Sequence, residues 1–270
     1  MTIDPRPIGI FDSGIGGLTV LAALQQRFPR ETFLYLGDTA RLPYGTKSPE
    51  TVARYSLRAS LFLLEHGIKA LVVACNTASS TALPVVEHAV TVPVIGVVEP
   101  GARAALALGA RRIGVIGTEA TVASGAYPRA INALEPAVEV VAQPCPLFVP
   151  LAEEGWFDHP VTREVARTYL APFRGAVGVL ILGCTHYPPL RPAIEAAVGP
   201  HVRLVDSALA VAEALAAMQA DGRVAPSSAS GSVRLLVTDA AARFSRIARL
   251  LLPDVRASLE LVDLPAYASR

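Results

Sequence analysis

Two seven-residue stretches decide the fold: Leu71-Val72-Val73-Ala74-Cys75-Asn76-Thr77 and Leu180-Ile181-Leu182-Gly183-Cys184-Thr185-His186. In each, an apolar run reaches a cysteine and continues into Asn or Thr, residue types that begin helices. Continuous apolar runs of this length are typical of parallel strands that are covered on both faces. Each stretch therefore predicts a buried strand that carries a cysteine at its carboxyl end and leads into a helix.

A second pair of similar stretches precedes the first. Ile8-Gly9-Ile10-Phe11-Asp12-Ser13 resembles Ile113-Gly114-Val115-Ile116-Gly117-Thr118. The spacing is 66 residues from Gly9 to Cys75 and 70 residues from Gly114 to Cys184. Matches in the same order at nearly equal spacing predict two similar half-units, with chance similarity between α/β units as the alternative. If the halves face each other about a pseudo-twofold axis, the two cysteines lie on opposite walls of one cleft.

The whole chain alternates short apolar runs with longer amphipathic stretches, which predicts α/β units on parallel sheets. The expected strands are 8–11, 33–36, 70–74, 94–97, 113–116, 138–141, 177–182, 202–205 and 233–237. Helical patterns cover 51–65, 77–89, 161–170, 208–219 and 241–251, and a segment rich in Ser at 226–231 predicts a surface connection. We expect two doubly wound α/β domains with a cleft between them, where the carboxyl ends of the strands bind ligands. Residues 1–97 with 208–270 form the first domain, and residues 98–207 form the second.

Composition argues against several functional classes. The chain has 270 residues, of which 52% are hydrophobic and 17% charged, and its net charge is +1. This balance gives no electrostatic reason to expect a nucleic acid or a membrane surface as partner. The N-terminus lacks a basic segment followed by an apolar one, and no apolar run nears the ~18 residues of a membrane helix. We therefore expect a cytoplasmic protein.

The cysteines differ in their settings. Cys75, Cys145 and Cys184 are far apart and odd in number, which predicts reduced thiols rather than a disulfide framework. The five histidines lack metal-ligand spacing, so no metal site is expected. A helix N-terminus favours a thiolate, so we expect the pKa of Cys75 and of Cys184 to fall from ~8.5 toward neutral. Cys145 lies between two prolines and is interpreted as structural.

Two activated thiols on opposite sides of a small ligand suit proton transfer at a carbon atom. One sulfur removes a proton, the other supplies one from the far side, and the product is the mirror image. Cysteine hydrolases instead need one cysteine with a histidine base, and redox enzymes need two sulfurs that can bond. Racemases that use pyridoxal phosphate hold it through a lysine. Lys69 lies at the wrong end of a strand and only Lys47 remains as a candidate, so we expect no cofactor.

Five motifs together resemble the glutamate racemase family. In order along the chain they are DSGIGG (12–17), GDTARLPYG (37–45), ACNTA (74–78), CPLFVPLAEEG (145–155) and GCTHYP (183–188). The resemblance implies a cofactor-independent racemase that interconverts L- and D-glutamate and supplies D-glutamate for peptidoglycan synthesis in the bacterial cytoplasm. It also implies two similar α/β domains, a C-terminal segment that returns to the first domain, and a homodimer. The catalytic cysteines of the family map onto Cys75 and Cys184.

The resemblance further implies residues that bind glutamate, namely Asp12, Ser13, Tyr44, Gly45, Asn76, Thr77, Thr185 and His186. The residues themselves suggest Asp38 and Glu153 as further candidates to assist. Hydroxyl and amide side chains at helix starts do suit carboxylates. Asp12 is a candidate to orient Cys75 or to hold an ammonium group. His186 is a candidate to adjust the pKa of the Cys184 thiol, or only to support the site by a hydrogen bond. Asp38 and Glu153 can equally be loop or cap carboxylates.

Other interpretations of the same residues stay open. Gly14-x-Gly16 after a strand, with Asp38 ending the next, matches part of a dinucleotide-binding fingerprint, but Thr19 stands at the third glycine position. A racemase of this fold that acts on aspartate, a hydantoin or a maleate-like diacid is a second possibility, since pocket size is not readable here. A non-enzymatic amino-acid-binding regulator is a third, although the presence of both cysteines argues against it. Arg41 has the chemistry of a carboxylate clamp, but no spacing supports that role.

Overall fold

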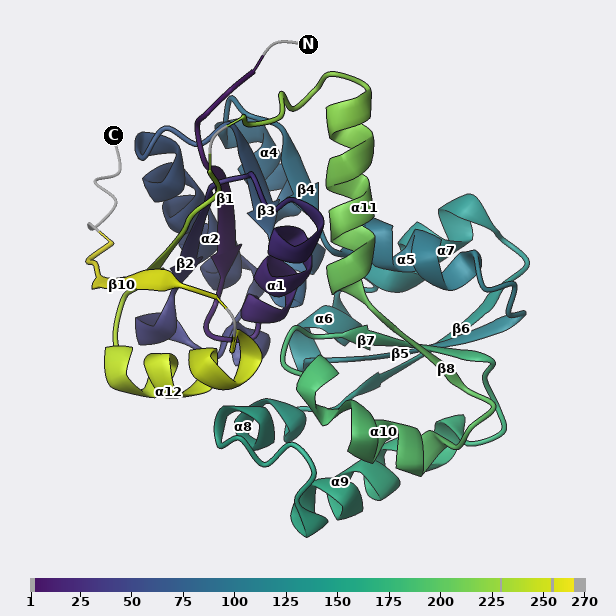
Figure 1. Ribbon diagram of the computed structural model, residues 1–270. Coiled ribbons are helices and arrows are strands. Elements are labelled where there is room, and N and C mark those ends of the chain that lie inside the picture. Colours follow the sequence, from purple (N-terminus) through teal and green to yellow (C-terminus); the bar gives the residue numbers. More distant parts are fainter. Residues whose placement is uncertain (1–2, 229, 254, 265–270) are drawn as a thin grey trace.

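The computed structural model describes residues 3–228, 230–253 and 255–264, and among them ten strands form two all-parallel sheets in two lobes (Figure 1). The first sheet has the order β10-β9-β2-β1-β3-β4, made of β1 (Ile8–Asp12), β2 (Phe33–Gly37), β3 (Ala70–Val73), β4 (Val94–Gly96), β9 (Val233–Val237) and β10 (Ala257–Leu261). The second has the order β6-β5-β7-β8, made of β5 (Arg112–Gly117), β6 (Glu139–Pro144), β7 (Val179–Gly183) and β8 (Arg203–Asp206).

The two sheets repeat one strand order. β1 lies between β2 and β3 with β4 beyond β3, and β5 lies between β6 and β7 with β8 beyond β7. The strands that precede Cys75 and Cys184, β3 and β7, therefore hold equivalent positions. This repetition confirms the doubled α/β fold predicted from the sequence. Division of the chain at 97/98 and 207/208 stays a prediction, with which the strand content of the sheets is compatible.

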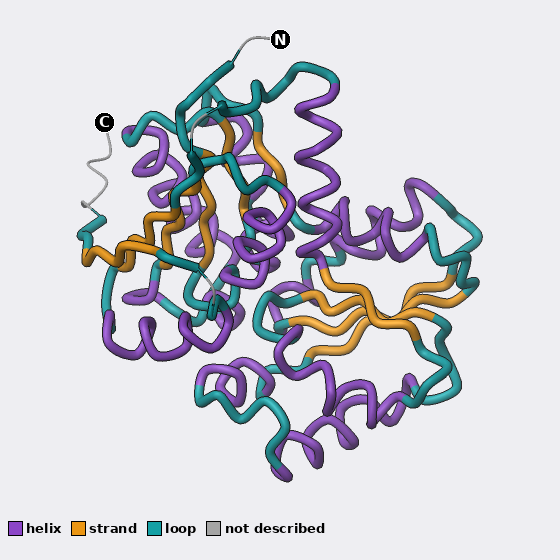
Figure 2. Tube along the Cα trace, in the orientation of Figure 1, coloured by secondary structure: helices purple, strands orange, loops and turns teal. Residues whose placement is uncertain are grey.

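Helices cover both faces of each sheet (Figure 2). They are α1 (Leu18–Arg27), α2 (Pro49–Glu65), α3 (Asn76–Thr81), α4 (Leu83–Ala89), α5 (Val98–Leu106), α6 (Glu119–Ala123), α7 (Ala126–Leu134), α8 (Phe148–Glu153), α9 (Pro160–Leu170), α10 (Arg191–Val198), α11 (Ser207–Ala220) and α12 (Ala241–Leu251). Short 3₁₀ turns span Thr39–Arg41, Tyr44–Thr46, Ala171–Phe173 and Pro188–Leu190. Alternate strand residues enter opposite cores: Ile8 and Ile10 pack on one face of the first sheet and Phe11 on the other.

The elements differ from the prediction at two informative places. All nine predicted strands form with bounds shifted by at most three residues, but β10 was missed because its residues, Ala-Ser-Leu-Glu-Leu, form no apolar run and lie exposed at the sheet edge. The helix predicted over 77–89 divides at Ala82 into α3 and α4. Pro84 lacks an N–H group and its ring would clash with the carbonyl four residues earlier, so one continuous helix cannot form.

Helix α11 connects the lobes. It carries the chain from β8 in the second sheet back to β9 in the first, and it packs against α1 and α5 (Figure 1). The C-terminal segment thus returns to the first lobe, as the resemblance implied.

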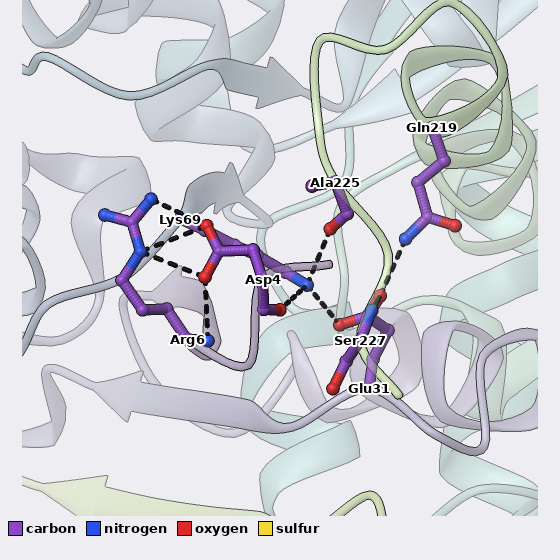
Figure 3. A network of polar contacts seen from close by, with 7 residues as sticks. All are labelled: Asp4, Arg6, Glu31, Lys69, Gln219, Ala225 and Ser227. Atoms are coloured by element: carbon purple, nitrogen blue, oxygen red, sulfur yellow. Dashed lines mark hydrogen bonds and ion pairs between the residues drawn. The ribbon is translucent and has the colours of Figure 1, made fainter. Parts of the chain in front are cut away.

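A buried ion pair lies at the amino end of β3, the end opposite Cys75 (Figure 3). Lys69 Nζ is 2.7 Å from Glu31 Oε2, and it donates hydrogen bonds to the carbonyl oxygens of Asp4 at 2.9 Å and Ala225 at 2.8 Å. The ammonium group therefore has two carbonyl acceptors and a carboxylate at ion-pair distance. This pairing offsets the desolvation that otherwise makes a buried lysine costly.

The same carboxylate holds the segment that follows α11. Glu31 Oε1 accepts from Gln219 Nε2 at 2.7 Å and from the backbone N–H of Ser227 at 2.9 Å. Ser227 is consequently buried, so the predicted surface connection at 226–231 is wrong at this residue, and residue 229 lies outside the described residues. The network ties the end of α11 to the base of the first sheet.

Replacing Lys69 by Met should lower the free energy of unfolding by about 3–5 kcal/mol, because Glu31 would remain buried without its counter-charge. Urea unfolding measures the change. The control is Arg27→Met, which removes an exposed pair with Glu213 at 3.5 Å and should cost under about 1 kcal/mol. Equal losses in the two variants would contradict this account of the network.

Candidate active site

Loops that follow strands of both sheets line one narrow cavity. Its volume is about 20 Å³, room for little more than one water molecule. The lining residues are Ser13, Leu42, Pro43, Tyr44, Gly45, Cys75, Asn76, Thr77, Thr118, Val149, Glu153, Cys184, Thr185 and His186. Both cysteines of the equivalent strands are among them, so the site draws on both lobes.

The wall contains most of the residues singled out in the sequence. Asp12 and Asp38 are the exceptions, since both are fully buried behind the wall. Four further lining residues were not predicted as site residues from the sequence: Leu42, Pro43, Thr118 and Val149. Thr118 follows β5 as Ser13 follows β1, so the internal repeat was the signal that could have found it.

Cys75 is held as a neutral thiol. It is 4% exposed, it precedes α3, and its Sγ donates to Ser13 Oγ at 3.5 Å. Burial, reinforced by the negative charge of Asp12, raises the pKa of Cys75 to about 12, against a smaller lowering by Ser13. The lowered pKa expected from the sequence is therefore wrong for Cys75, because desolvation outweighs the favourable end of a six-residue helix.

Cys184 has a different environment. Its Sγ lies 3.8 Å from His186 Nδ1, and His186 Nε2 lies 3.3 Å from Glu153 Oε1, within ion-pair range but outside hydrogen-bond geometry. Burial works against a charged imidazole, yet the Cys184 sulfur and the carboxylates of Glu153 and Asp12 raise the pKa of His186 to about 10. The imidazole of His186 and the Cys184 sulfur are thus direct neighbours on the cavity wall.

Asp12 is buried behind the cavity wall and connects the two lobes through a hydrogen bond. Its Oδ2 accepts from the N–H of Gly14 at 2.9 Å, and its Oδ1 accepts from Thr185 Oγ1 at 3.2 Å. Burial raises the pKa of Asp12, and the charge of His186 and these hydrogen bonds partly offset that rise. Since Asp12 ends β1 and Thr185 follows β7, this contact fixes one lobe against the other.

Glycine at two positions allows the two lobes to lie this close together. A Cβ atom at Gly16 would overlap Thr185 Oγ1 and lie 2.6 Å from His186 Nδ1. At Gly45 a Cβ would lie 2.5 Å from the Cβ of Thr118, across the other side of the cavity. The two glycines are therefore required by close packing between lobes.

Asp38 supports the loop after β2. Its carboxylate accepts from Tyr44 Oη at 2.7 Å, from Arg41 Nη1 at 2.7 Å and from Thr238 Oγ1 at 3.0 Å. Tyr44 is on the cavity wall, whereas Arg41 is paired with Asp38 and does not line the cavity. The contacts point to Asp38 as the anchor of Tyr44.

The start of α3 bonds to the second lobe. Asn76 Nδ2 donates to Tyr127 Oη at 2.7 Å, and Tyr127 Oη shares a 3.3 Å hydrogen bond with Ser207 Oγ at the beginning of α11. The hydroxyls of Thr77 and Thr118 share a bond of 2.9 Å. Tyr127 gave no signal in the sequence, because it lies within a helix and in no recognisable motif.

A second cavity of the described structure differs from this one in its lining. A larger cavity of about 720 Å³ lies between α4, α5 and α11, but none of the predicted site residues lines it. The small cavity is the candidate site because the thiols, the imidazole and the hydroxyls meet there. In the part of the chain that the structure describes, no three His, Cys, Asp or Glu side chains form a group that could hold a metal ion.

Comparisons with known proteins agree along nearly the whole chain. Residues 18–215 match the family model described as Asp/Glu/Hydantoin racemase. A glutamate racemase from Geobacter metallireducens is 50% identical over 264 residues, which are 97% of this chain and 98% of that protein. The structure of Francisella tularensis glutamate racemase in complex with D-glutamate has a TM-score of 0.91 at 37% identity, covering 98% of this chain and 100% of that one. Thermus thermophilus glutamate racemase in complex with β-chloro-D-alanine has a TM-score of 0.87 at 49% identity, covering 97% and 99%.

Replacing Gly16 by Ala should lower the pKa of His186 from about 10 toward its usual value, because the new methyl group pushes the imidazole away from Cys184. NMR titration of the histidine ring measures this, with His186→Asn to assign the resonance. Gly14→Ala is the matched control, since its Cβ would meet Leu42 Cδ2 at 3.6 Å, an ordinary contact. An unchanged titration in the Gly16 variant would refute the packing argument.

Proposed function

The chain belongs to the Asp/Glu/hydantoin racemase family and is an isomerase, and we propose that it interconverts L- and D-glutamate with two cysteines as acid and base, without a cofactor. The observation that carries the proposal is that Cys75 and Cys184, from equivalent strands of the two sheets, line a single cavity. Relatives named glutamate racemase, one at 50% identity and one solved with D-glutamate, support glutamate as the substrate.

The two sulfurs have different neighbours. Burial raises the pKa of Cys75 to about 12, which keeps it a thiol, whereas Cys184 Sγ lies 3.8 Å from Nδ1 of His186. The Cys184 sulfur takes the α-proton of one enantiomer, so that a C–H bond breaks and an S–H bond forms. The Cys75 thiol then gives its proton to the opposite face of the same carbon. The sulfurs have now exchanged roles, and the reverse reaction runs from this state.

Neutral donors dominate the wall around the reacting carbon. The hydroxyl and amide side chains are those of Ser13, Tyr44, Asn76, Thr77, Thr118 and Thr185. Among the described residues that line the cavity, no Lys or Arg is present, and the charged groups are Glu153 and His186. Hydroxyls, the amide and N–H groups at the start of α3 suit two carboxylates without a fixed cation. In this proposal Asp12 positions Thr185, and Asp38 positions Tyr44, rather than touching glutamate.

Substrate entry requires the cavity to widen. A volume of about 20 Å³ accepts a water molecule but not glutamate. Since both lobes and the loop around Leu42–Gly45 contribute to the wall, movement of these parts relative to each other opens the site. Closure then excludes water, which protects the carbanion-like α-carbon from solvent protons and strengthens the electrostatic contacts.

The cellular role belongs to the same proposal. D-Glutamate made here would supply peptidoglycan synthesis in a bacterial cytoplasm, and the enzyme would act as a homodimer, as the family resemblance implies. In the residues that the structure describes, no helix combines the length and apolarity that crossing a bilayer demands. Light scattering of the purified protein measures the oligomeric state.

Cys75→Ala and Cys184→Ala should each lower kcat for both enantiomers by at least about 10³-fold, because each removes one of the two proton carriers. Circular dichroism follows the change of chirality. Cys145→Ala is the matched control, a third buried cysteine that does not line the cavity, and it should keep most of the activity. Racemisation at the parent rate by either cavity variant would exclude the two-base mechanism.

Incubation with L-glutamate in deuterium oxide, after dialysis against a chelator and with no added cofactor, tests the function itself. We expect D-glutamate that carries deuterium at Cα, while recovered L-glutamate stays unlabelled early on, because acid and base are separate groups. L-Aspartate in a parallel sample should react more slowly. A requirement for pyridoxal phosphate or metal, or faster turnover of aspartate, would overturn the corresponding part of the proposal.

A further inference from the structure

An arginine of the first lobe reaches the acidic end of a helix of the second. Arg243 Nη2, on α12, lies 3.5 Å from Glu153 Oε2 and donates to Glu154 Oε1 at 2.9 Å. Helix α12 lies between β9 and β10, whereas α8, which contains Glu153, follows β6 of the other sheet (Figure 1). The ion pairs therefore cross from one lobe to the other, as the hydrogen bond of Asp12 to Thr185 does.

The chain just beyond α8 also lies near apolar side chains of α12. A Cβ atom added at Gly155, two residues beyond the end of α8, would lie 3.8 Å from Leu250 Cδ1 and 3.9 Å from Ile247 Cδ1. Both of those side chains belong to α12. The end of α8 is therefore close to α12, and Arg243 supplies the charged contact of this support.

Glu153 links this support to the reacting groups. One carboxylate oxygen faces Arg243, and the other lies 3.3 Å from His186 Nε2, whose ring reaches Cys184 Sγ at 3.8 Å. Charges alternate in sign from Arg243 to Glu153 to the imidazolium. The Glu153 side chain is 11% exposed and that of Arg243 is 49% exposed. This series of charged groups therefore runs from solvent into the site.

We propose that Arg243 is a positioning residue: from α12 it holds the carboxylate of Glu153 against His186, and thereby keeps the imidazolium beside Cys184. The inference rests on the proposed racemase function, because it assigns Arg243 to the Cys184 half of the two-base site. Arg243 touches neither cysteine and does not line the cavity.

The sign of the effect follows from the groups around His186. These are Cys184 after β7, Glu153 on α8 and Asp12 at the end of β1. His186 and Arg243 lower the pKa of Glu153 against the effect of burial, and Glu153 in turn raises the pKa of His186. Removal of the Arg243 charge alone would favour a neighbouring imidazolium, so the proposed effect depends on position: without Arg243 the carboxylate of Glu153 moves away from His186. The pKa of His186 then falls, and the imidazolium is lost at a lower pH.

The test measures kcat/KM against pH for the parent enzyme and for Arg243→Gln, with glutamate of either configuration. We expect kcat/KM to fall about two- to fivefold, the range for a half-exposed ion pair, and the alkaline limb to move to lower pH by about half a unit. Because L- and D-glutamate have equal free energies in water, the profiles in the two directions must shift together. NMR titration of the His186 ring should show a fall in its pKa.

Two further variants separate positioning from general stability. Arg243→Lys keeps the charge and should restore most of the alkaline limb, whereas Arg246→Gln, another exposed arginine of α12, should leave the profile unchanged. If the parent racemises glutamate but Arg243→Gln has the parent profile and the parent His186 titration, Arg243 has no positioning role. If the parent itself does not racemise glutamate, the proposed function fails instead.

Discussion

Two lobes meet at one narrow cavity, and the geometry of the site depends on how closely they approach. The approach is fixed by the hydrogen bond from Thr185 to Asp12 and by bare backbone at Gly16 and Gly45, where a single methyl group would not fit. Without this closeness the sulfurs of Cys75 and Cys184 would belong to separate sites. Because the lobes lie so close together, the groups at the cavity are buried, and burial strongly shifts their pKa values. A charged side chain there needs a partner of opposite charge or a hydrogen bond.

The doubled fold brings equivalent strands together, but the sequence makes their ends unlike. After β3 the chain reads Cys75-Asn76-Thr77, and after β7 it reads Cys184-Thr185-His186. A histidine in place of a threonine gives one sulfur an imidazole neighbour, while the other sulfur lies beside the hydroxyl of Ser13 and near the charge of Asp12. The proposed mechanism uses this chemical asymmetry within a repeated scaffold, because it needs one acid and one base that exchange roles.

Much of this could be predicted from the sequence, because buried parallel strands leave continuous apolar runs and strand ends collect at one edge. Strand β10 left no such run, since it lies exposed at a sheet edge. The pKa of Cys75 was predicted in the wrong direction, because a helix N-terminus is visible in sequence whereas the depth of burial is not. Tyr127 and Arg243 went unnoticed for a related reason: each acts across the lobes, and only tertiary structure brings them to Asn76 and Glu153.

A structure of this protein with bound glutamate tests the central claim most directly. The account predicts that the α-carbon lies between the two sulfurs, with Sγ of Cys75 and Sγ of Cys184 on opposite faces and each about 3–4 Å away, the separation that proton transfer needs. A complex in which only one sulfur reaches the α-carbon, or in which both lie on the same face, would contradict it.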